Sequence, residues 1–272
     1  MDITRVVTRS RLSTDLRALG LAEGDCVMLH ESVREIGWVV GGPDVVLDAV
    51  LDVLGPAGTL MKLVGSEDGT YELADWPHEV QEAYLAERPV FSRERTRACR
   101  EWGILCEYLR TRPGAHRSPH PEASFAAVGR LADWLTREHP LDHGYGPGSP
   151  LGRVIEANGR VLLLGAPLDS VTLLHHAEYA AAIPHKRVAR YRVPVARAGE
   201  RTWLPVEELD SSLGIVPYPY GDYFARAVQA FLDAGLGRSG CVGHAQAHLL
   251  DAPALHRFGV SWFERELMRY AD

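Results

Sequence analysis

The chain has 272 residues, 46% hydrophobic and 24% charged, a composition typical of a globular protein. Its formal net charge of −7 leaves no basic excess for a phosphate backbone, so we expect no nucleic-acid partner. The charged N-terminus lacks a signal-peptide core and no apolar run approaches the ~20 residues of a membrane span, so we expect a cytoplasmic protein that makes no membrane contact.

The cysteines and the absence of linkers limit the possible domain organisation of the chain. Cys26, Cys99, Cys106 and Cys241 form no CxxC pair, which argues against a zinc ribbon and against a disulfide framework. No repeat, low-complexity tract or linker divides the chain. We therefore predict a single domain over residues 1–272, and the sequence leaves open whether the chain forms a homodimer.

The first predicted elements form a strand–helix–strand unit. The stretch "STDLRALG" predicts a short helix that Ser13 or Thr14 caps and Gly20 ends. The run "DCVMLHES" predicts a strand, and a helix beginning at Pro43 follows it in "GGPDVVLDAVLDVLGPAG". That helix is apolar except for a stripe of Asp44, Asp48 and Asp52, which indicates packing against a sheet. A second strand follows in "GTLMKLVG".

The later elements repeat this alternation of strand and helix. The apolar run "GRVLLLG" predicts a buried strand, and a helix over "TLLHHAEYAAAIPHK" follows it, capped by Asp169 or Ser170 and ended by Pro184. Two further helices are predicted in "YFARAVQAFLDAG" and "SWFERELMRY". The pattern indicates an α/β fold with a largely parallel or mixed central sheet flanked by helices.

A glycine-rich loop precedes the helix at Pro43. Gly37, Gly41 and Gly42 would place backbone N–H groups near a helix N-terminus, where an anion such as a pyrophosphate can bind. The loop matches neither GxGxxG nor a Walker loop, so a plain tight turn is an equal alternative.

The helix over residues 172–186 holds the main candidate residues. Thr172, His175 and Glu178 follow at i+3 spacing and share one face, so a carboxylate can orient the ring of His175. His176 points about 100° away from that face. A structural histidine, a metal site and a general base are the alternatives, and the absence of HExxH or HxxEH spacing disfavours a zinc hydrolase.

Segments along nearly the whole chain resemble those of one enzyme family. They are "LHESVREIGWVVGG", "RTRPGAHRSPHPEASFAAVG", "GYGPGSPLGRVIEANG", "LLLGAPLDSVTLLHHAEYAAAIPHKR", "DSSLGI", "CVGHAQAHLLDA" and "FGVSWFE". In this order they resemble the aminoglycoside 3-N-acetyltransferase family, antibiotic N-acetyltransferases that are unrelated to the GNAT fold.

The resemblance implies acetyl transfer from acetyl-coenzyme A to the 3-amino group of a 2-deoxystreptamine antibiotic, with no metal. His175 matches the catalytic base of the family and Glu178 the acid that follows it. Ser32 and the loop from Gly37 to Gly42 fall where coenzyme A is bound. Further residues that match motifs lining the same cleft are Arg117, Ser118, His120 and Ser149.

The resemblance is weakest where the antibiotic is expected. Glu31 stands beside Ser32 where the family usually has a small residue, and Lys62 also departs from many members. The acidic residues that look similar to those lining the antibiotic pocket are Asp68, Glu72, Glu208 and Asp210. Taken singly, each of these is better interpreted as a solvated surface carboxylate, and only the resemblance groups them.

The mechanism can also be reasoned from the residues. An ammonium cannot attack a thioester, so a histidine, with an ordinary pKa near ~6.5, suits the removal of its proton. Thr172, Ser149 or a backbone N–H could stabilise the oxyanion. Direct attack in a ternary complex is the favoured route and an acetyl-cysteine relay the alternative. An acetyltransferase acting on another amine, a metal-dependent hydrolase and a non-catalytic ligand-binding protein remain alternatives.

Overall fold

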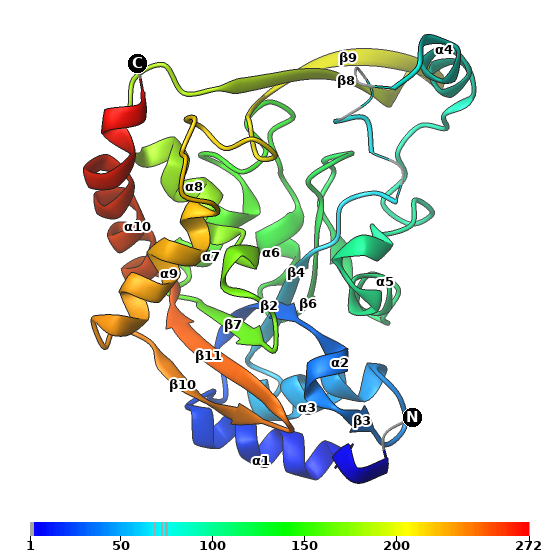
Figure 1. The fold of residues 1–272 in the computed structure, drawn as a ribbon. Coiled ribbons are helices and arrows are strands. Elements are labelled where there is room, and N and C mark those ends of the chain that lie inside the picture. The colour runs from blue at the N-terminus through cyan, green and yellow to red at the C-terminus, as the bar shows by residue number, and fades with distance from the viewer. Residues whose placement is uncertain (1–2, 68, 72, 74–75, 272) are drawn as a thin grey trace.

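The structure, a computed structural model, is built on one central sheet (Figure 1). It describes residues 3–67, 69–71, 73 and 76–271, and within these ranges the sheet has seven strands in the order β10-β11-β7-β2-β4-β6-β5. Strands β7, β2 and β4 run parallel, and the strands added at both edges are antiparallel. The strand bounds are Cys26–Glu31 (β2), Thr59–Leu63 (β4), His116–Arg117 (β5), Phe125–Gly129 (β6), Arg160–Leu164 (β7), Arg238–Val242 (β10) and Ala245–Asp251 (β11). The mixed sheet confirms the predicted fold class.

Helices cover both faces of this sheet because its strands bury alternate side chains on each side. Val27 and Leu29 of β2 pack into one core and Met28 into the other. On the first face lie α1 (Arg9–Leu19), α3 (Asp44–Leu54) and α5 (Ile104–Arg110). On the second face lie α6 (Ala132–Thr136), α7 (Pro150–Glu156), α8 (Leu173–Ala180), α9 (Tyr223–Asp233) and α10 (Ala252–Leu267).

Helix α1 starts earlier than the sequence predicted. Thr8 caps it by accepting a hydrogen bond from the Arg11 backbone N–H at 3.2 Å. Ser13 lies inside the helix instead, where its hydroxyl donates to the Ala49 carbonyl at 3.3 Å. The predicted end is confirmed, because Gly20 adopts the left-handed conformation with φ 110°.

The polar stripe of α3 pairs with arginines of neighbouring segments. Arg9 contacts Asp52 at 2.6 Å and Asp48 at 3.4 Å, and Arg112 pairs with Asp48 from the other side. This stripe therefore holds α1 against α3. The helix begins at Asp44, directly after Pro43.

Helix α8 is shorter than the sequence predicted. Residues Leu168–Ser170 form a separate 3-10 helix, and the Ser170 hydroxyl donates to the Pro167 carbonyl at 2.6 Å instead of capping α8. The α-helix begins at Leu173 after Thr172 and ends at Ala180, before the extended Ala181. The predicted cap and the predicted end at Pro184 were wrong, although the segment from 173 to 180 is helical as expected.

Two features outside the main sheet were not predicted. A two-stranded ribbon of β8 (Val188–Arg197) and β9 (Glu200–Leu209) extends along one side of the molecule towards α4 (His78–Glu87) (Figure 1). A small parallel pair joins β1 (Val6–Val7) to β3 (Trp38–Val39), with α2 (Val33–Ile36) just before β3. Among the described residues, no helix combines the length and hydropathy needed to cross a bilayer.

Candidate active site

A cleft of 690 Å³ opens at the carboxyl ends of the parallel strands. The last residues of β2 and β4 line it, together with the loop that follows β7 and the start of α8. Strand β2 is paired with β4 on one side and β7 on the other, so the chain leaves β2 in one direction and later returns on the opposite side. Open α/β sheets bind their ligands at such a switch point.

Two further cavities adjoin this cleft through shared residues. A cavity of 610 Å³ shares Glu101, Trp102, Tyr145 and Ser211 with it. A smaller cavity of 300 Å³ shares Asp169, His175 and Ser211. The three cavities meet at Ser211, so a ligand could occupy more than one of them.

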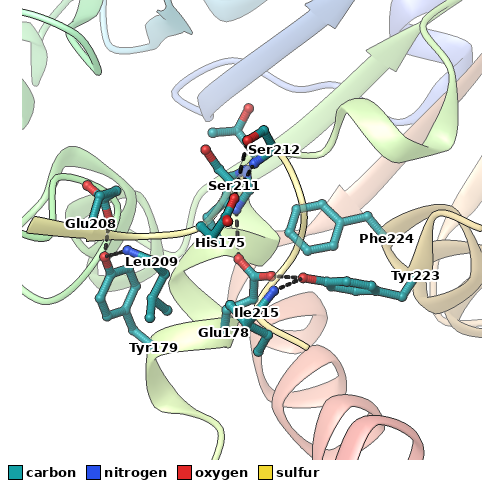
Figure 2. A network of polar contacts seen from close by, with 12 residues as sticks. His175, Glu178, Tyr179, Glu208, Leu209, Ser211, Ser212, Ile215, Tyr223 and Phe224 are labelled. Carbon is teal, nitrogen blue, oxygen red and sulfur yellow. Dashed lines mark hydrogen bonds and ion pairs between the residues drawn. The ribbon is translucent and has the colours of Figure 1, made fainter. Parts of the chain in front are cut away.

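His175 and Glu178 are hydrogen-bonded at the wall of the cleft (Figure 2). The His175 Nδ1 lies 2.7 Å from the Glu178 Oε2, and the two side chains are 19% and 2% exposed. An ionised carboxylate only accepts hydrogen bonds, so Nδ1 carries the ring hydrogen. In the part of the chain that the structure describes, Nε2 makes no hydrogen bond, and its lone pair is available to a ligand.

Aromatic rings hold the imidazole of His175 from two sides. Tyr145 stacks on it with the ring centroids 5.0 Å apart and an interplanar angle of 23°. Phe224 packs against it with a centroid distance of 4.7 Å. These rings restrict the imidazole, while Thr172 lies at the cleft wall one turn before it.

His176 occupies a different environment from its neighbour. Its Nδ1 lies 3.0 Å from the Nε2 of His256 on α10. Burial, together with the nearby His256, lowers the pKa of His176 to about 4. His176 is thus a neutral packing residue between helices and does not line the cleft with His175.

A buried ion pair forms part of the cleft wall. The ammonium of Lys62 on β4 contacts Glu31 on β2, and their side chains are 4% and 1% exposed. Burial lowers the pKa of Lys62, but the Glu31 carboxylate outweighs burial and leaves that pKa raised. The two departures noted in the sequence are therefore partners of each other.

The predicted cofactor-binding residues fall in different places. Ser32 directly follows β2 and lines the cleft. Gly37, Gly41 and Gly42 do not line it. Gly41 instead borders a separate surface cavity, where Asp44 and Asp48 both pair with Arg112.

Arg117, Ser118, His120 and Ser149 are also placed outside the cleft lining, as buried side chains. The Arg117 guanidinium binds the carbonyl groups of Gly65 and Thr96. The Ser118 hydroxyl binds His139 at 2.9 Å, and His120 accepts the backbone N–H of Ala123 at 2.9 Å. Within the described residues the Ser149 hydroxyl has no partner. The contacts of Arg117, Ser118 and His120 fix loops and leave them little capacity to bind a ligand directly.

The carboxylates predicted to bind the antibiotic also fall in different places, one lining a cavity and one shaping a turn. Glu208 lines the 610 Å³ cavity, where its carboxylate accepts the Gly144 N–H at 2.5 Å and the hydroxyl of Tyr179. Burial raises its pKa. The Asp210 carboxylate accepts the Leu213 N–H at 2.8 Å and so shapes a turn. Asp68 and Glu72 lie outside the described residues.

Several residues of the cleft were not predicted from the sequence. Tyr145, Glu101 and Trp102 line the cleft itself, and Tyr223 and Phe224 line the adjoining 300 Å³ cavity. Tyr223 and Phe224 follow Asp222, which caps α9, so a pair of aromatic residues after a helix cap was the available signal. The Glu101 carboxylate makes neither a hydrogen bond nor an ion pair within the described part of the chain, and Glu101 lies where two cavities meet. In that same part, no three His, Cys, Asp or Glu side chains are grouped closely enough to hold a metal ion.

Comparison with known proteins gives consistent matches over the chain. The family profile described as aminoglycoside 3-N-acetyltransferase matches residues 28–264. Aminoglycoside N(3)-acetyltransferase VII of Streptomyces paromomycinus is 46% identical over 97% of this chain and 93% of its own length. Aminoglycoside N(3)-acetyltransferase VIII of Streptomyces fradiae is 48% identical over 96% and 93%.

Solved structures match the fold as well. Aminoglycoside acetyltransferase AAC(3)-Xa superposes with a TM-score of 0.93 at 47% identity, covering 98% of this chain and 97% of its own. AAC-IIIb in a binary complex with CoASH has a TM-score of 0.89 at 44% identity, covering 98% of each chain. AAC-VIa bound to sisomicin has a TM-score of 0.89 at 37% identity, covering 98% and 99%. The chain belongs to the aminoglycoside 3-N-acetyltransferase family, which makes it an acyltransferase.

Proposed function

We propose that the protein transfers the acetyl group of acetyl-coenzyme A to the 3-amino group of a 2-deoxystreptamine aminoglycoside, with His175 as general base. The observation that carries this proposal is the hydrogen bond of 2.7 Å from Nδ1 to Glu178, which leaves Nε2 free in the cleft. A neutral imidazole with a free nitrogen can accept the proton of the antibiotic ammonium.

The reaction then proceeds by direct attack. The neutral amine adds to the thioester carbonyl carbon, the carbon–sulfur bond breaks, and the departing thiolate takes the proton from the imidazolium. The regenerated imidazole then removes the second proton from the attacking nitrogen, which leaves the neutral amide, and passes that proton to solvent. Glu178 stabilises the imidazolium between these steps. A backbone N–H or the Thr172 hydroxyl at the cleft wall is the candidate donor to the oxyanion.

The cysteines favour direct attack over an acetyl-cysteine relay. Burial raises the pKa of Cys26 to about 12 and that of Cys106 to about 11, so both stay protonated thiols. Cys99 borders the 610 Å³ cavity, and burial also raises its pKa. A relay would need a thiolate beside the base, and none of these three thiols supplies one.

The two substrates are proposed to enter different parts of the cleft. Ser32 and Arg34 line the 690 Å³ cavity, and we assign to that side the donor, the coenzyme that the related AAC-IIIb binds as CoASH. Glu101 and Glu208 border the 610 Å³ cavity with Tyr71 and Tyr191, a setting suited to the ammonium groups and sugar rings of the antibiotic. The related AAC-VIa is bound to sisomicin, which supports an antibiotic of this kind as the second substrate.

The test is to mix the protein with acetyl-coenzyme A and a panel of aminoglycosides and to follow thiol release. We expect release only when both substrates are present, and NMR of the product should place the acetyl group on the 3-amino nitrogen. No release with any aminoglycoside, or acetylation at another nitrogen, would contradict the proposal. Loss of activity on treatment with a chelator would instead favour the metal-dependent alternative.

A further inference from the structure

Trp102 places an exposed indole at the junction of the two large cavities. The residue is 42% exposed and lines both the 690 Å³ cleft and the 610 Å³ cavity. Within the described residues no other ring packs on the indole, and its Nε1 makes no hydrogen bond. A large apolar ring that stays open inside a cleft is typical of a group that anchors a ligand.

The segment that carries Trp102 is held by hydrogen bonds on both sides. The Glu67 carboxylate accepts the backbone N–H of Arg100 at 2.7 Å, and the Cys106 thiol donates to the Trp102 carbonyl at 3.2 Å. Gly103 ends the 3-10 helix Arg100–Trp102 with φ 98°, a conformation that favours glycine. The backbone therefore fixes the place from which the indole enters the junction.

The indole packs on the backbone of Gly65, directly after β4. A Cβ atom at Gly65 would lie 2.2 Å from the Trp102 Cζ3, so any side chain there would displace the ring. The Gly65 carbonyl is held in turn, because it accepts hydrogen bonds from the Arg117 guanidinium and, at 3.0 Å, from the Ser124 hydroxyl. One part of the indole is thus packed against a fixed backbone, and the exposed part is left to the cavities.

The ring that carries the reacting amine has to pass this junction. Tyr145 also lines both cavities, and it stacks on His175. The amine must reach His175 and an acetyl group in the cleft, while the rest of the antibiotic occupies the 610 Å³ cavity. Its ring therefore lies beside Trp102. Ammonium substituents polarise the C–H groups of such a ring, and an aromatic surface attracts positively polarised groups.

We propose that Trp102 is a specificity-determining residue, and that the central 2-deoxystreptamine ring of the acceptor packs against its exposed indole. This inference rests on the proposed function and deepens it, because it assigns to Trp102 the central ring and not one of the attached sugars. The carboxylate of the neighbouring Glu101 can hold an ammonium group of the same ring.

The first test is Trp102→Leu, which keeps an apolar side chain but removes the aromatic surface. The dissociation constants of sisomicin and of free 2-deoxystreptamine should both rise by about tenfold, a factor typical of such contacts. Trp102→Phe keeps a ring and should lose much less, and coenzyme A affinity should change little in either variant. Calorimetric titration, with competition for the weaker ligand, measures these constants.

The matched control is Trp38→Leu. Trp38 is 41% exposed, almost as much as Trp102, but it lines neither the 690 Å³ cleft nor the 610 Å³ cavity. Its substitution should leave the affinity for sisomicin and 2-deoxystreptamine unchanged.

Three results would overturn the inference. If Trp102→Leu weakened the binding of sisomicin but not that of 2-deoxystreptamine, the indole would contact an attached sugar. If it weakened coenzyme A as much as sisomicin, the indole would only shape the wall of the cleft. If it bound both acceptor ligands as tightly as the parent protein, the indole would have no part in recognising them.

A readout without turnover keeps this inference separate from the proposed function. Fluorine NMR of the wild-type sequence labelled with 5-fluorotryptophan follows each indole, and Trp102→Phe assigns the signal of Trp102. That signal should move when 2-deoxystreptamine is added, and the signal of Trp38 should not. This measurement decides the question even if Trp102→Leu melts below the assay temperature.

The two proposals can then fail independently. If the Trp102 signal moves but no aminoglycoside causes thiol release, the proposed function fails and the recognition of the central ring stands. If thiol is released while the Trp102 signal stays in place at saturating 2-deoxystreptamine, the function stands and this inference is overturned.

Discussion

His175 and His176 are identical side chains on adjacent residues, yet their partners give them different chemistry. His175 faces the cleft with a carboxylate on its Nδ1, whereas His176 faces α10 with a second imidazole on its Nδ1. The i+3 spacing to Glu178 was sufficient to predict the first pairing from the sequence. The pairing with His256 spans 80 positions, and no local pattern could have indicated it.

The first prediction compares these two histidines. His175→Ala should lower kcat by about 10²–10⁴-fold with little change in substrate affinity, because general-base assistance is lost. His176→Ala should lower thermal stability and leave most of the activity. Steady-state kinetics and melting curves of both variants provide the check, and a dead His176→Ala beside an active His175→Ala would exclude the proposed base.

The second prediction concerns the Lys62–Glu31 pair. Lys62→Met should lower the free energy of unfolding by about 3–5 kcal/mol, because it leaves a buried carboxylate without its counter-ion. Glu31→Leu combined with Lys62→Met removes both charges and should regain most of that loss. Urea unfolding of the single and double variants measures this, and a double variant less stable than Lys62→Met would show that the pair itself stabilises the fold.

At the scale of elements, strands with clear apolar patterns were predicted from the sequence. Elements whose structure depends on contacts with distant residues were missed. The buried runs that become β2, β4 and β7 are continuous apolar segments, so their strands were predicted. The β8–β9 ribbon was missed because charged residues and two prolines, Pro194 and Pro205, interrupt its pattern and much of its surface is solvated. Strands β10 and β11 were missed because Gly240 and Gly243 favour a loop.

The third prediction concerns the segment that receives the donor. The exposed side chain of Arg34 lies in α2 and lines the cleft, whereas Gly42 lies after β3 and does not. Arg34→Glu should weaken coenzyme A binding roughly tenfold to hundredfold, because a charge-assisted contact is replaced by repulsion. Gly42→Asp also introduces a carboxylate, at a position where a Cβ would meet open space but where φ is +95°, so the substitution strains the backbone. In a variant shown to be folded, affinity should be nearly unchanged. Calorimetric titration of both variants with coenzyme A is the measurement. A loss of affinity in Gly42→Asp but not in Arg34→Glu would instead place the donor at the glycine loop.

At the scale of the whole molecule, the sequence located the His175–Glu178 pair but not the shape of the cleft. Neighbouring positions suffice for a His–Glu pair on one helix. The cleft instead joins residues from β2, β4, the segment 101–104, Tyr145, α8 and Ser211, which only the strand order brings together. The motif residues Arg117, Ser118 and His120 belong to the same region, where they fix the loops around the cleft.

The stability of the whole molecule should depend on pH through its buried histidines. Burial lowers the pKa of His30 to about 3 and those of His120 and His176 to about 4, and it lowers the pKa of His139 well below the ordinary value. Unfolding returns each of these groups to a pKa near ~6.5, so the unfolded chain binds more protons below that pH.

The fourth prediction follows from this sign. The free energy of unfolding should be highest above pH ~6.5 and should fall towards pH 4, by about 1.4 kcal/mol per pH unit for each histidine that stays neutral in the fold. Burial raises the pKa values of Glu31 and Glu208, which act in the opposite direction because the folded state then binds their protons more readily. Two carboxyls offset only part of the effect of the four histidines. Urea unfolding between pH 5 and 7.5 measures the slope.

His30→Met removes a buried imidazole whose Nε2 has no partner within the described residues, so the slope should become shallower by about one proton. His78→Ala is the control, because the side chain of His78 is 83% exposed and its loss should leave the slope unchanged. Equal stability at pH 5 and 7.5 would mean that these histidines become protonated without unfolding the protein.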